Sequence, residues 1–298
     1  MKKVLFATTA LVATAGMAAA EVTFGGYGRF GLYYQEGASE ETRVEQRFRL
    51  TITGQTTTDN GLEFEGRIRL QSDENADGTI ESADTSAAGF AVSTGGFRLD
   101  VGNVSDVLDS GDVVNYYGYG VGLTSFIEQS SDQAPAITGF GTTAEGDTKG
   151  TTIKARYSVA DFTVSLSHTT DNGSETDENT QLGFGYNFGN YSAGIVFSDY
   201  DNGADFVAAS FGGEVGALAF SILLVDSDAR SDLGYGFSVN YDVSAMTSVQ
   251  FAFSDGDTGD EDYGVGFRHG LGGGVSLRGG IGSKNGDTVA DLGVLFNF

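Results

Sequence analysis

Apolar and polar residues alternate with a period of two along most of the chain. In residues 42–54, the phase that contains Val44, Phe48 and Ile52 alternates with arginine, glutamate and threonine. Residues 61–71 repeat the pattern after the turn-forming sequence Thr-Thr-Asp-Asn-Gly. A period of two predicts β-strands with one apolar and one polar face, because successive side chains of a strand point to opposite sides.

This alternation predicts sixteen strands whose connections differ at the two ends. The strands are expected near residues 22–34, 42–54, 61–71, 88–95, 96–104, 150–158, 160–170, 179–188, 191–200, 205–213, 217–226, 233–242, 246–254, 263–269, 274–283 and 288–298. Short connections such as 189–190, 212–216 and 270–274 alternate with longer, acidic ones such as 72–87 and 255–262. This arrangement is typical of an all-β, transmembrane antiparallel β-barrel.

The N-terminal residues have the three parts of a secretory signal. Residues 1–3 are basic, 4–17 are mostly apolar, and 18–20 are alanines. We expect residues 1–20 to be cleaved as a signal peptide, since the uncharged run is short for a membrane anchor. Residues 21–298 are then expected to form one barrel domain.

The composition excludes several classes of protein. The chain has no cysteine, so disulfides, cysteine zinc sites and cysteine nucleophiles are excluded. Its net charge of −25 argues against a nucleic-acid binder, which needs a basic face. The longest apolar run after the signal, 217–225, is too short for a transmembrane helix. With 22 Phe, 13 Tyr, 46 Gly and a single Pro, the chain favours long strands joined by tight turns.

The basic residues of the predicted strands lie in the phase opposite to the apolar residues. They are Arg29, Arg43, Arg47, Arg49, Arg67, Arg69, Arg98, Lys154, Arg156, Arg268 and Arg278. An Arg or Lys on the lipid face costs about 2–4 kcal/mol at the bilayer midplane, which explains this segregation in a barrel. A soluble β-sandwich would also alternate, but it would not need sixteen strands or the aromatic pair Phe188 and Tyr191 beside a turn.

The last residues carry the most specific pattern. Ala290, Leu292, Val294, Phe296 and Phe298 share one phase, and the chain stops at the phenylalanine. Outer-membrane barrels end in this way. Pairing of this strand with the first one would remove both free sheet edges.

One long segment, residues 105–149, interrupts the alternation after the fifth predicted strand. Loops of this length are commonly functional. Its acidic residues include Asp106, Asp109, Asp112, Glu128 and Asp132, followed by Glu145 and Asp147. If the loop folds into the lumen, these carboxylates can face the arginines of the first five strands, which are Arg29, Arg43, Arg47, Arg49, Arg67, Arg69 and Arg98. The narrowest passage would then carry a transverse electric field that sets selectivity. The alternative is a loop outside the barrel with solvated carboxylates.

The mature chain resembles the general-diffusion porins of Rhodobacter-like alphaproteobacteria. The resemblance rests on four stretches: Glu21-Val22 followed by Gly25, Gly28, Arg29 and Gly31; Thr53-Gly54 with Gly61-Leu62-Glu63-Phe64; Tyr186-Asn187-Phe188-Gly189-Asn190-Tyr191; and Val289-Ala290-Asp291-Leu292-Gly293-Val294 with Phe296 and Phe298. It implies a sixteen-stranded barrel, a homotrimer, a third loop folded inside as the constriction, passive diffusion of small hydrophilic solutes, and calcium at acidic loop sites.

Two other kinds of site were weighed on the residues themselves. Acidic loops with Asp73, Asp77, Asp255, Asp257 and Asp260 supply oxygen ligands for Ca²⁺, but they lack EF-hand spacing, and solvated acidic loops are the alternative. Divalent cations could also bridge such loops to lipopolysaccharide or to neighbouring subunits.

Both histidines, His168 and His269, lie in the apolar phase near strand ends. This placement suits the membrane interface better than a catalytic dyad.

The sequence therefore predicts an outer-membrane porin that is not an enzyme and needs no cofactor. A substrate-specific outer-membrane channel is the nearest alternative, and a secreted calcium-binding β-protein or a barrel hydrolase is a more distant one.

Overall fold

Sixteen strands of six or more residues and one two-residue strand form a single antiparallel sheet in the computed structural model of the chain. The structure describes residues 20–75, 77–132, 151–170, 178–201, 203–256 and 259–298. The strands are β1 (Glu21–Gln35), β2 (Thr42–Thr57), β3 (Glu63–Asp73), β4 (Asp84–Thr85), β5 (Gly89–Thr94), β6 (Phe97–Gly102), β7 (Thr152–Val159), β8 (Phe162–Thr169), β9 (Asn179–Phe188), β10 (Tyr191–Tyr200), β11 (Phe206–Val215), β12 (Leu218–Ser227), β13 (Gly234–Ser244), β14 (Thr247–Asp255), β15 (Asp262–Gly272), β16 (Val275–Lys284) and β17 (Asp287–Asn297). A short helix, α1 (Val107–Ser110), follows β6. None of the described residues belongs to a helix that is long and apolar enough to cross a membrane.

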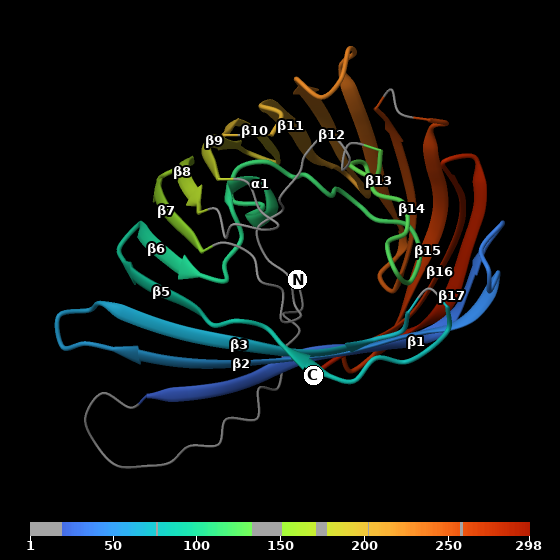
Figure 1. Ribbon diagram of the computed structural model, residues 1–298, viewed down its shortest axis with the longest axis horizontal. Helices are drawn as coiled ribbons and strands as arrows, with labels where there is room; N and C mark the ends of the chain where they lie inside the picture. The colour runs from blue at the N-terminus through green and yellow to red at the C-terminus, as the bar shows by residue number, and fades with distance from the viewer. Residues whose placement is uncertain (1–19, 76, 133–150, 171–177, 202, 257–258) are drawn as a thin grey trace.

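The first and last strands pair with each other and close the sheet into a barrel (Figure 1). Their register runs from Tyr27↔Asn297 to Gln35↔Val289. The other wall strands pair with their neighbours along the chain, except that β3 pairs with both β5 and the two-residue β4. Closure leaves the wall without a free edge. The predicted closed, sixteen-stranded antiparallel barrel is confirmed.

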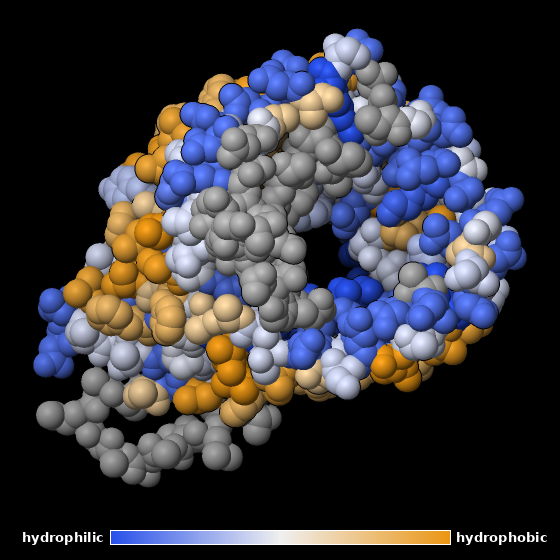
Figure 2. Space-filling model, in the orientation of Figure 1, coloured by the Kyte–Doolittle hydropathy of each residue, from blue (hydrophilic) through white to orange (hydrophobic). Residues whose placement is uncertain are grey.

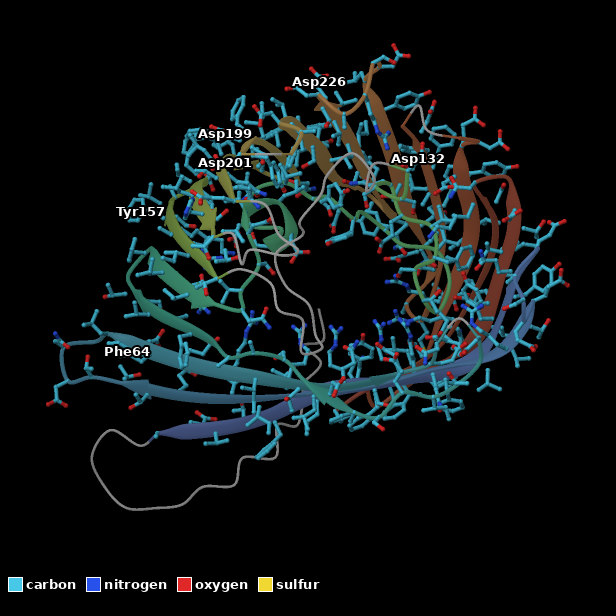
Figure 3. All side chains as sticks on the ribbon, in the orientation of Figure 1. Phe64, Asp132, Tyr157, Asp199, Asp201 and Asp226 are labelled. Atoms are coloured by element: carbon cyan, nitrogen blue, oxygen red, sulfur yellow. The ribbon has the colours of Figure 1, made fainter. Side chains whose placement is uncertain are left out.

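Side chains alternate between an apolar outer surface and a polar inner one. On the closing strands, Phe30 and Leu292 lie on the outer surface and are 54% and 51% exposed, whereas Asp291 is buried inside. Figure 3 shows Phe64 and Tyr157 outside the wall and Asp132 inside it. In Figure 2, apolar residues gather on the outer wall, while polar residues border the right and lower sides of the central opening. This distribution matches a barrel with lipid outside and water inside.

Tight turns join the strands at one end. Six of them are two residues long: 95–96, 160–161, 189–190, 216–217, 245–246 and 273–274. The turns expected at 212–216 and 270–274 were predicted too long, because the backbone ladder continues through glycines such as Gly212, which pairs with Ser221. Residues 1–19, which hold nearly all of the expected signal peptide, lie outside the described residues.

Candidate functional site

The segment that follows β6 runs through the interior of the barrel (Figure 1). Its first turn is α1, where the Asp106 carboxylate caps the helix by accepting a hydrogen bond from Asp109 N (2.8 Å). Gly111 ends the helix in the left-handed conformation. Of the predicted loop at 105–149, the structure describes residues up to 132; Pro135, Glu145 and Asp147 lie outside the described residues.

The barrel wall holds this loop by its backbone amides. The acceptors are Ser167 Oγ for Val107 N (3.2 Å), Gln181 Oε1 for Leu108 N (2.9 Å), Ser210 Oγ for Asn115 N (2.9 Å), Ser238 Oγ for Tyr119 N (2.9 Å) and Ser254 Oγ for Asp132 N (3.0 Å). These residues belong to five different strands, so the loop is attached along a large part of the wall. Each bond satisfies a loop donor that would otherwise need water.

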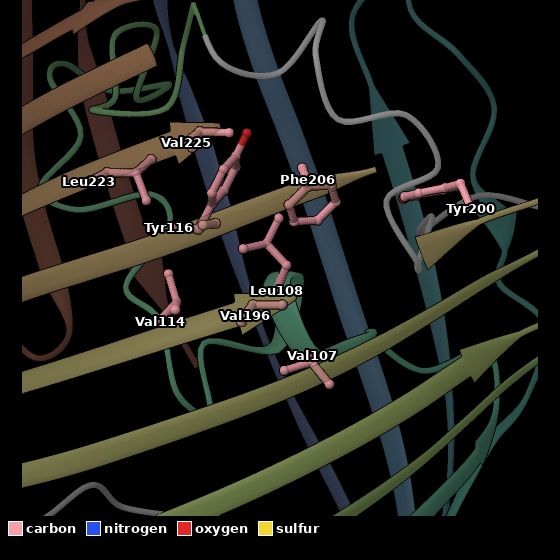
Figure 4. Close-up of a cluster of buried hydrophobic side chains, with 10 residues drawn as sticks. Val107, Leu108, Val114, Tyr116, Val196, Tyr200, Phe206, Leu223 and Val225 are labelled. Atoms are coloured by element: carbon pink, nitrogen blue, oxygen red, sulfur yellow. The ribbon is translucent and has the colours of Figure 1, made fainter. Parts of the chain in front are cut away.

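An apolar cluster fixes the first half of the loop to β10, β11 and β12 (Figure 4). It contains Val107, Leu108, Val114 and Tyr116 from the loop, and Val196, Tyr200, Phe206, Ala208, Leu223 and Val225 from the wall. Each of these side chains is at most 5% exposed. Burying a side chain of this size stabilises by about 1.5–3 kcal/mol, so the cluster is a strong attachment.

Glycines in the wall let the loop backbone approach closely. A Cβ at Gly194 would overlap the carbonyl oxygen of Val113, and one at Gly236 would overlap that of Gln129. Because the overlapping atoms belong to the backbone, no side-chain rotation could relieve the clash. Glycine at these two wall positions therefore allows the loop backbone to lie directly against the wall.

The predicted constriction acids have different partners. Asp106 is buried beside Gln181, and burial raises its pKa to about 6. Asp112 lies 2.9 Å from Lys154 Nζ and 2.6 Å from Arg156 Nη1. Burial opposes the charge of Asp112, but these two cations outweigh it and lower the pKa.

The other three acids lie further along the interior. Asp109 accepts a hydrogen bond from the Tyr117 hydroxyl (2.5 Å). Burial raises the pKa of Glu128 to about 7, against the attraction of Lys284. Asp132 is buried, and its carboxylate accepts a hydrogen bond from Gly256 N.

The arginines of the first strands are neutralised mainly by carboxylates of the wall itself. The ion pairs are Arg29–Glu45 (2.5 Å), Arg43–Glu74 (2.5 Å), Arg47–Asp73, Arg98–Glu65 (3.2 Å) and Arg98–Asp100 (2.9 Å). Arg49 donates to Gln71. The expected pairing of these arginines with loop carboxylates was therefore incomplete, because acids on β2 and β3 and in the wall nearby lie closer. Within the described residues, Arg67 and Arg69 have no carboxylate oxygen within 4.0 Å.

Loop acids and wall arginines nevertheless share one cavity. Its volume is about 510 Å³, and its lining includes Arg29 and Arg43 on the wall and Asp109 and Glu128 on the loop. Figure 3 shows nitrogen atoms gathered on the inner face of the wall formed by the first strands. Opposite charges therefore border the same water-accessible space.

The acidic residues that were weighed as calcium ligands and that the structure describes do not gather into a site. Asp73 is paired with Arg47 in the wall, Asp77 accepts a hydrogen bond from Thr79 N (3.0 Å), and Asp255 ends β14. Asp260 lies in the loop before β15, and Asp257 is outside the described residues. No group of three or more acidic or histidine side chains within the described residues could hold a metal ion.

Two features of the site were missed in the sequence. One is the apolar inner surface of β10–β12, for which the run at 217–225 is the available signal. Its residues are apolar in both phases, which indicates a strand covered on both faces. The other is Asp291, which accepts hydrogen bonds from the loop at Leu123 N and Thr124 N (both 2.8 Å). Asp291 is a charged residue between the apolar residues Ala290 and Leu292 of the last strand, and this position is the signal that could have indicated a buried contact.

Known proteins share this architecture over nearly the whole chain. Residues 7–289 match the model of the Gram-negative porin family. The porin of Fuscovulum blasticum is 30% identical over 307 residues, and that of Rhodobacter capsulatus is 26% identical over 321 residues. Each match covers 93% of this chain and 100% of the relative. Among solved structures, a mutant of Rh. blastica porin superposes with a TM-score of 0.78 at 26% identity, covering 93% of this chain and 100% of that one.

The closed barrel, its apolar outer face and its polar interior fit these matches, and the extent of the family match decides the assignment. The chain belongs to the Gram-negative porin family and forms a general diffusion channel in the outer membrane.

Proposed function

We propose that the loop at 105–149 forms the narrowest part of this channel and filters solutes by size and charge. The observation that carries the proposal is the cavity bordered by Arg29 and Arg43 on one side and by Asp109 and Glu128 on the other. A solute in this space meets positive charge on the wall and negative charge on the loop. Charged residues at such close quarters govern which ions pass.

The charges of the pore are unequal in their effect. Arg29, Arg43, Arg47 and Arg98 each have a neighbouring carboxylate, so their fields largely cancel at a distance. The net positive charge of this sector then comes mainly from Arg67 and Arg69. We therefore assign the anion-attracting part of the lumen to these two residues, and the cation-attracting part to Asp109 and Glu128.

We further propose that the protein catalyses no reaction. His168 and His269 lie on β8 and β15, which are not neighbouring strands. His168 contacts Thr180 Oγ1 (3.0 Å), and His269 contacts Thr247 Oγ1 (2.8 Å). His168 also lies 3.6 Å from the carboxylate of Glu178. The proposal therefore rests on the match to a family of channels rather than on these contacts.

Three copies of the chain are proposed to assemble around the sector of β5 and β6. These strands have six residues each, whereas a strand that crosses the hydrocarbon core needs about 9–11. Phe90 on β5 and Phe64 on β3 are 58% and 44% exposed on the outer face. A short, apolar wall is better covered by protein than by lipid.

Lipopolysaccharide and divalent cations are proposed partners of the acidic outer loops, without a defined metal site.

Single-channel recording in a planar bilayer tests the proposal. The expected result is stepwise opening, with a reversal potential in a salt gradient that moves toward cation preference when Arg67 and Arg69 are replaced by glutamine. Replacing Arg98, which is held by two carboxylates, is the control and is expected to move it less. Equal shifts for both variants, or no conductance from inserted protein, would contradict the assignment. Selective saturation by one solute would indicate a substrate-specific channel instead.

A further inference from the structure

The tip of the inward loop is docked on the seam where the barrel closes. Residues 121–127 form a tight turn, in which Val121 N donates to Ile127 O (2.9 Å). Val121 and Ile127 are fully buried, and Leu123 is 2% exposed. Beneath the tip lie the closing strands β1 and β17 with the neighbouring strands β15 and β16.

Asp291 of β17 is the polar anchor of the tip. One carboxylate oxygen accepts from Leu123 N (2.8 Å), and the other accepts from Thr124 N (2.8 Å) and Thr124 Oγ1 (2.9 Å). The side chain of Asp291 is buried. Gly122 precedes these donors with φ +91°, a backbone conformation that turns the two amides toward one carboxylate. Hydrogen bonds to an ionised acceptor are stronger than neutral ones.

Leu123 fills a socket that both closing strands supply. Gly31 of β1 and Gly293 of β17 are paired directly across the seam. A Cβ at Gly31 or Gly293 would lie 2.3 Å from a carbonyl oxygen of the opposite strand, and 2.9 or 2.6 Å from Leu123 Cδ2. The two glycines therefore let the closing strands approach each other, and Leu123 packs where these strands meet.

The seam differs from the other junctions of the wall. β1 and β17 are the two ends of the sheet and are not joined by a connecting segment, whereas most neighbouring strands share a turn. Their union therefore depends on the ladder and on whatever spans it. The loop tip spans it, since it contacts Gly31 on one strand and Gly293 and Asp291 on the other.

We propose that the loop tip is a latch on barrel closure, with Asp291 and Leu123 as its positioning residues. The socket is complete only after β17 has paired with β1, so the loop docks in a closed barrel and then holds the seam shut. Closure of the wall and narrowing of the lumen become one coupled event. The consequence is that an incompletely closed barrel has an undocked loop.

The rate of unfolding in hot detergent tests the latch. Asp291→Asn presents an amide to one of the loop donors, and Leu123→Ala empties the socket. Ser238→Ala is the matched control, because Ser238 holds the same loop at Tyr119 N and Gln129 Oε1 but lies on β13, away from the seam. Asp291→Asn is expected to unfold about tenfold faster than Ser238→Ala, since a hydrogen bond to a charged group is worth at least this factor. Leu123→Ala is expected to unfold faster by a similar factor, because it removes buried side-chain atoms at the seam.

A covalent lock on the seam separates the two roles of the tip. Leu32 and Leu292 lie opposite each other across β1 and β17, and the chain has no cysteine of its own. With Leu32→Cys and Leu292→Cys oxidised to a disulfide, the difference in unfolding rate between Asp291→Asn and Ser238→Ala is expected to disappear. Asp291→Asn is expected to give noisier single-channel currents than the parent both with and without this disulfide, because its loop tip lacks the carboxylate that positions it.

Two results would overturn the latch. One is equal unfolding rates of Asp291→Asn, Leu123→Ala and Ser238→Ala. The other is a rate difference that the disulfide leaves unchanged. If Asp291→Asn does not fold, Leu123→Ala keeps the carboxylate and gives the same comparison. The unfolding rate does not depend on where the channel is narrowest, so the latch and the proposed filter fail separately.

Discussion

Two adjacent leucines on β12 give a sharp test of how the loop is held in the lumen. Leu223 is fully buried in the cluster with Val107, Leu108 and Tyr116, whereas Leu224 is 42% exposed on the outer face. Both can be replaced by alanine with the same loss of volume. The two substitutions therefore differ only in the side of the wall that they affect.

The size of the effect follows from what covers Leu223. Without the loop this side chain would face the water-filled lumen, so most of its burial depends on docking. Truncating a buried leucine to alanine costs about 2–5 kcal/mol. A loss of about 3 kcal/mol would raise the undocked fraction of the loop about 150-fold. Leu224→Ala leaves a gap that lipid chains fill, and its cost falls outside the docking equilibrium.

Single-channel recording reads this equilibrium directly. Leu223→Ala is expected to show frequent transitions to a higher conductance, as the loop leaves the wall and the lumen widens. Leu224→Ala is expected to match the parent channel. Quiet currents from both variants would refute the claim that the apolar cluster holds the loop, and equal noise from both would refute the inward placement of Leu223.

Three further predictions concern charge. Burial raises the pKa of Glu128 to about 7, so this carboxyl is mostly neutral below that pH and mostly ionised above it. Raising the pH from 6 to 8 should therefore increase cation preference in reversal-potential measurements. Glu128→Gln should remove this pH dependence. Arg43→Gln should shift selectivity less than Arg69→Gln at pH 8. Burial and a neighbouring acid raise the pKa of Glu74 to about 7, so Glu74 is mostly ionised beside Arg43 at pH 8, and loss of Arg43 raises this pKa further and lets Glu74 take up a compensating proton. Equal shifts would contradict this. Asp112→Asn should leave Lys154 and Arg156 unneutralised and increase anion preference. The effect is expected at any pH from 5 to 8, because the pKa of Asp112 lies below its usual range and the parent carboxylate is ionised throughout. An unchanged reversal potential would show that this charge lies outside the ion path.

The barrel wall could be predicted because its physics is local. Each strand separates lipid from water, so every second residue is constrained, and the alternation around Val44 and Phe48 is visible without knowledge of any partner. The terminal stripe that ends at Phe298 likewise follows from one strand facing lipid. Closure was predictable because the two unpaired edges of such a sheet have only each other to pair with.

The interior could be predicted only in part, because its contacts join residues far apart in the chain. The arginine phase was visible, but the partners of Arg43 and Arg47 depend on the register of β2 and β3, which places Arg47 opposite Asp73. The docking of Leu108 against Phe206 depends on a loop path that has no period. The apolar inner surface of β12 is visible in the sequence as the run at 217–225, in which both faces of the strand are mostly apolar. Lipid covers the outer face, and the docked loop covers the inner one.

The way in which the loop is fastened separates its attachment from its chemistry. Ser167, Ser210, Ser238 and Ser254 bind backbone amides, which every residue except proline supplies. Asp109 and Glu128 border the passage without belonging to the apolar cluster or to the bonds that attach the loop to the wall, whereas Tyr116 and Thr124 do both. The lining of the pore can therefore change during evolution, or by design, without dismantling its support. One wall can carry many different filters, and a bacterium that meets new solutes can alter permeability through a few substitutions at unattached positions.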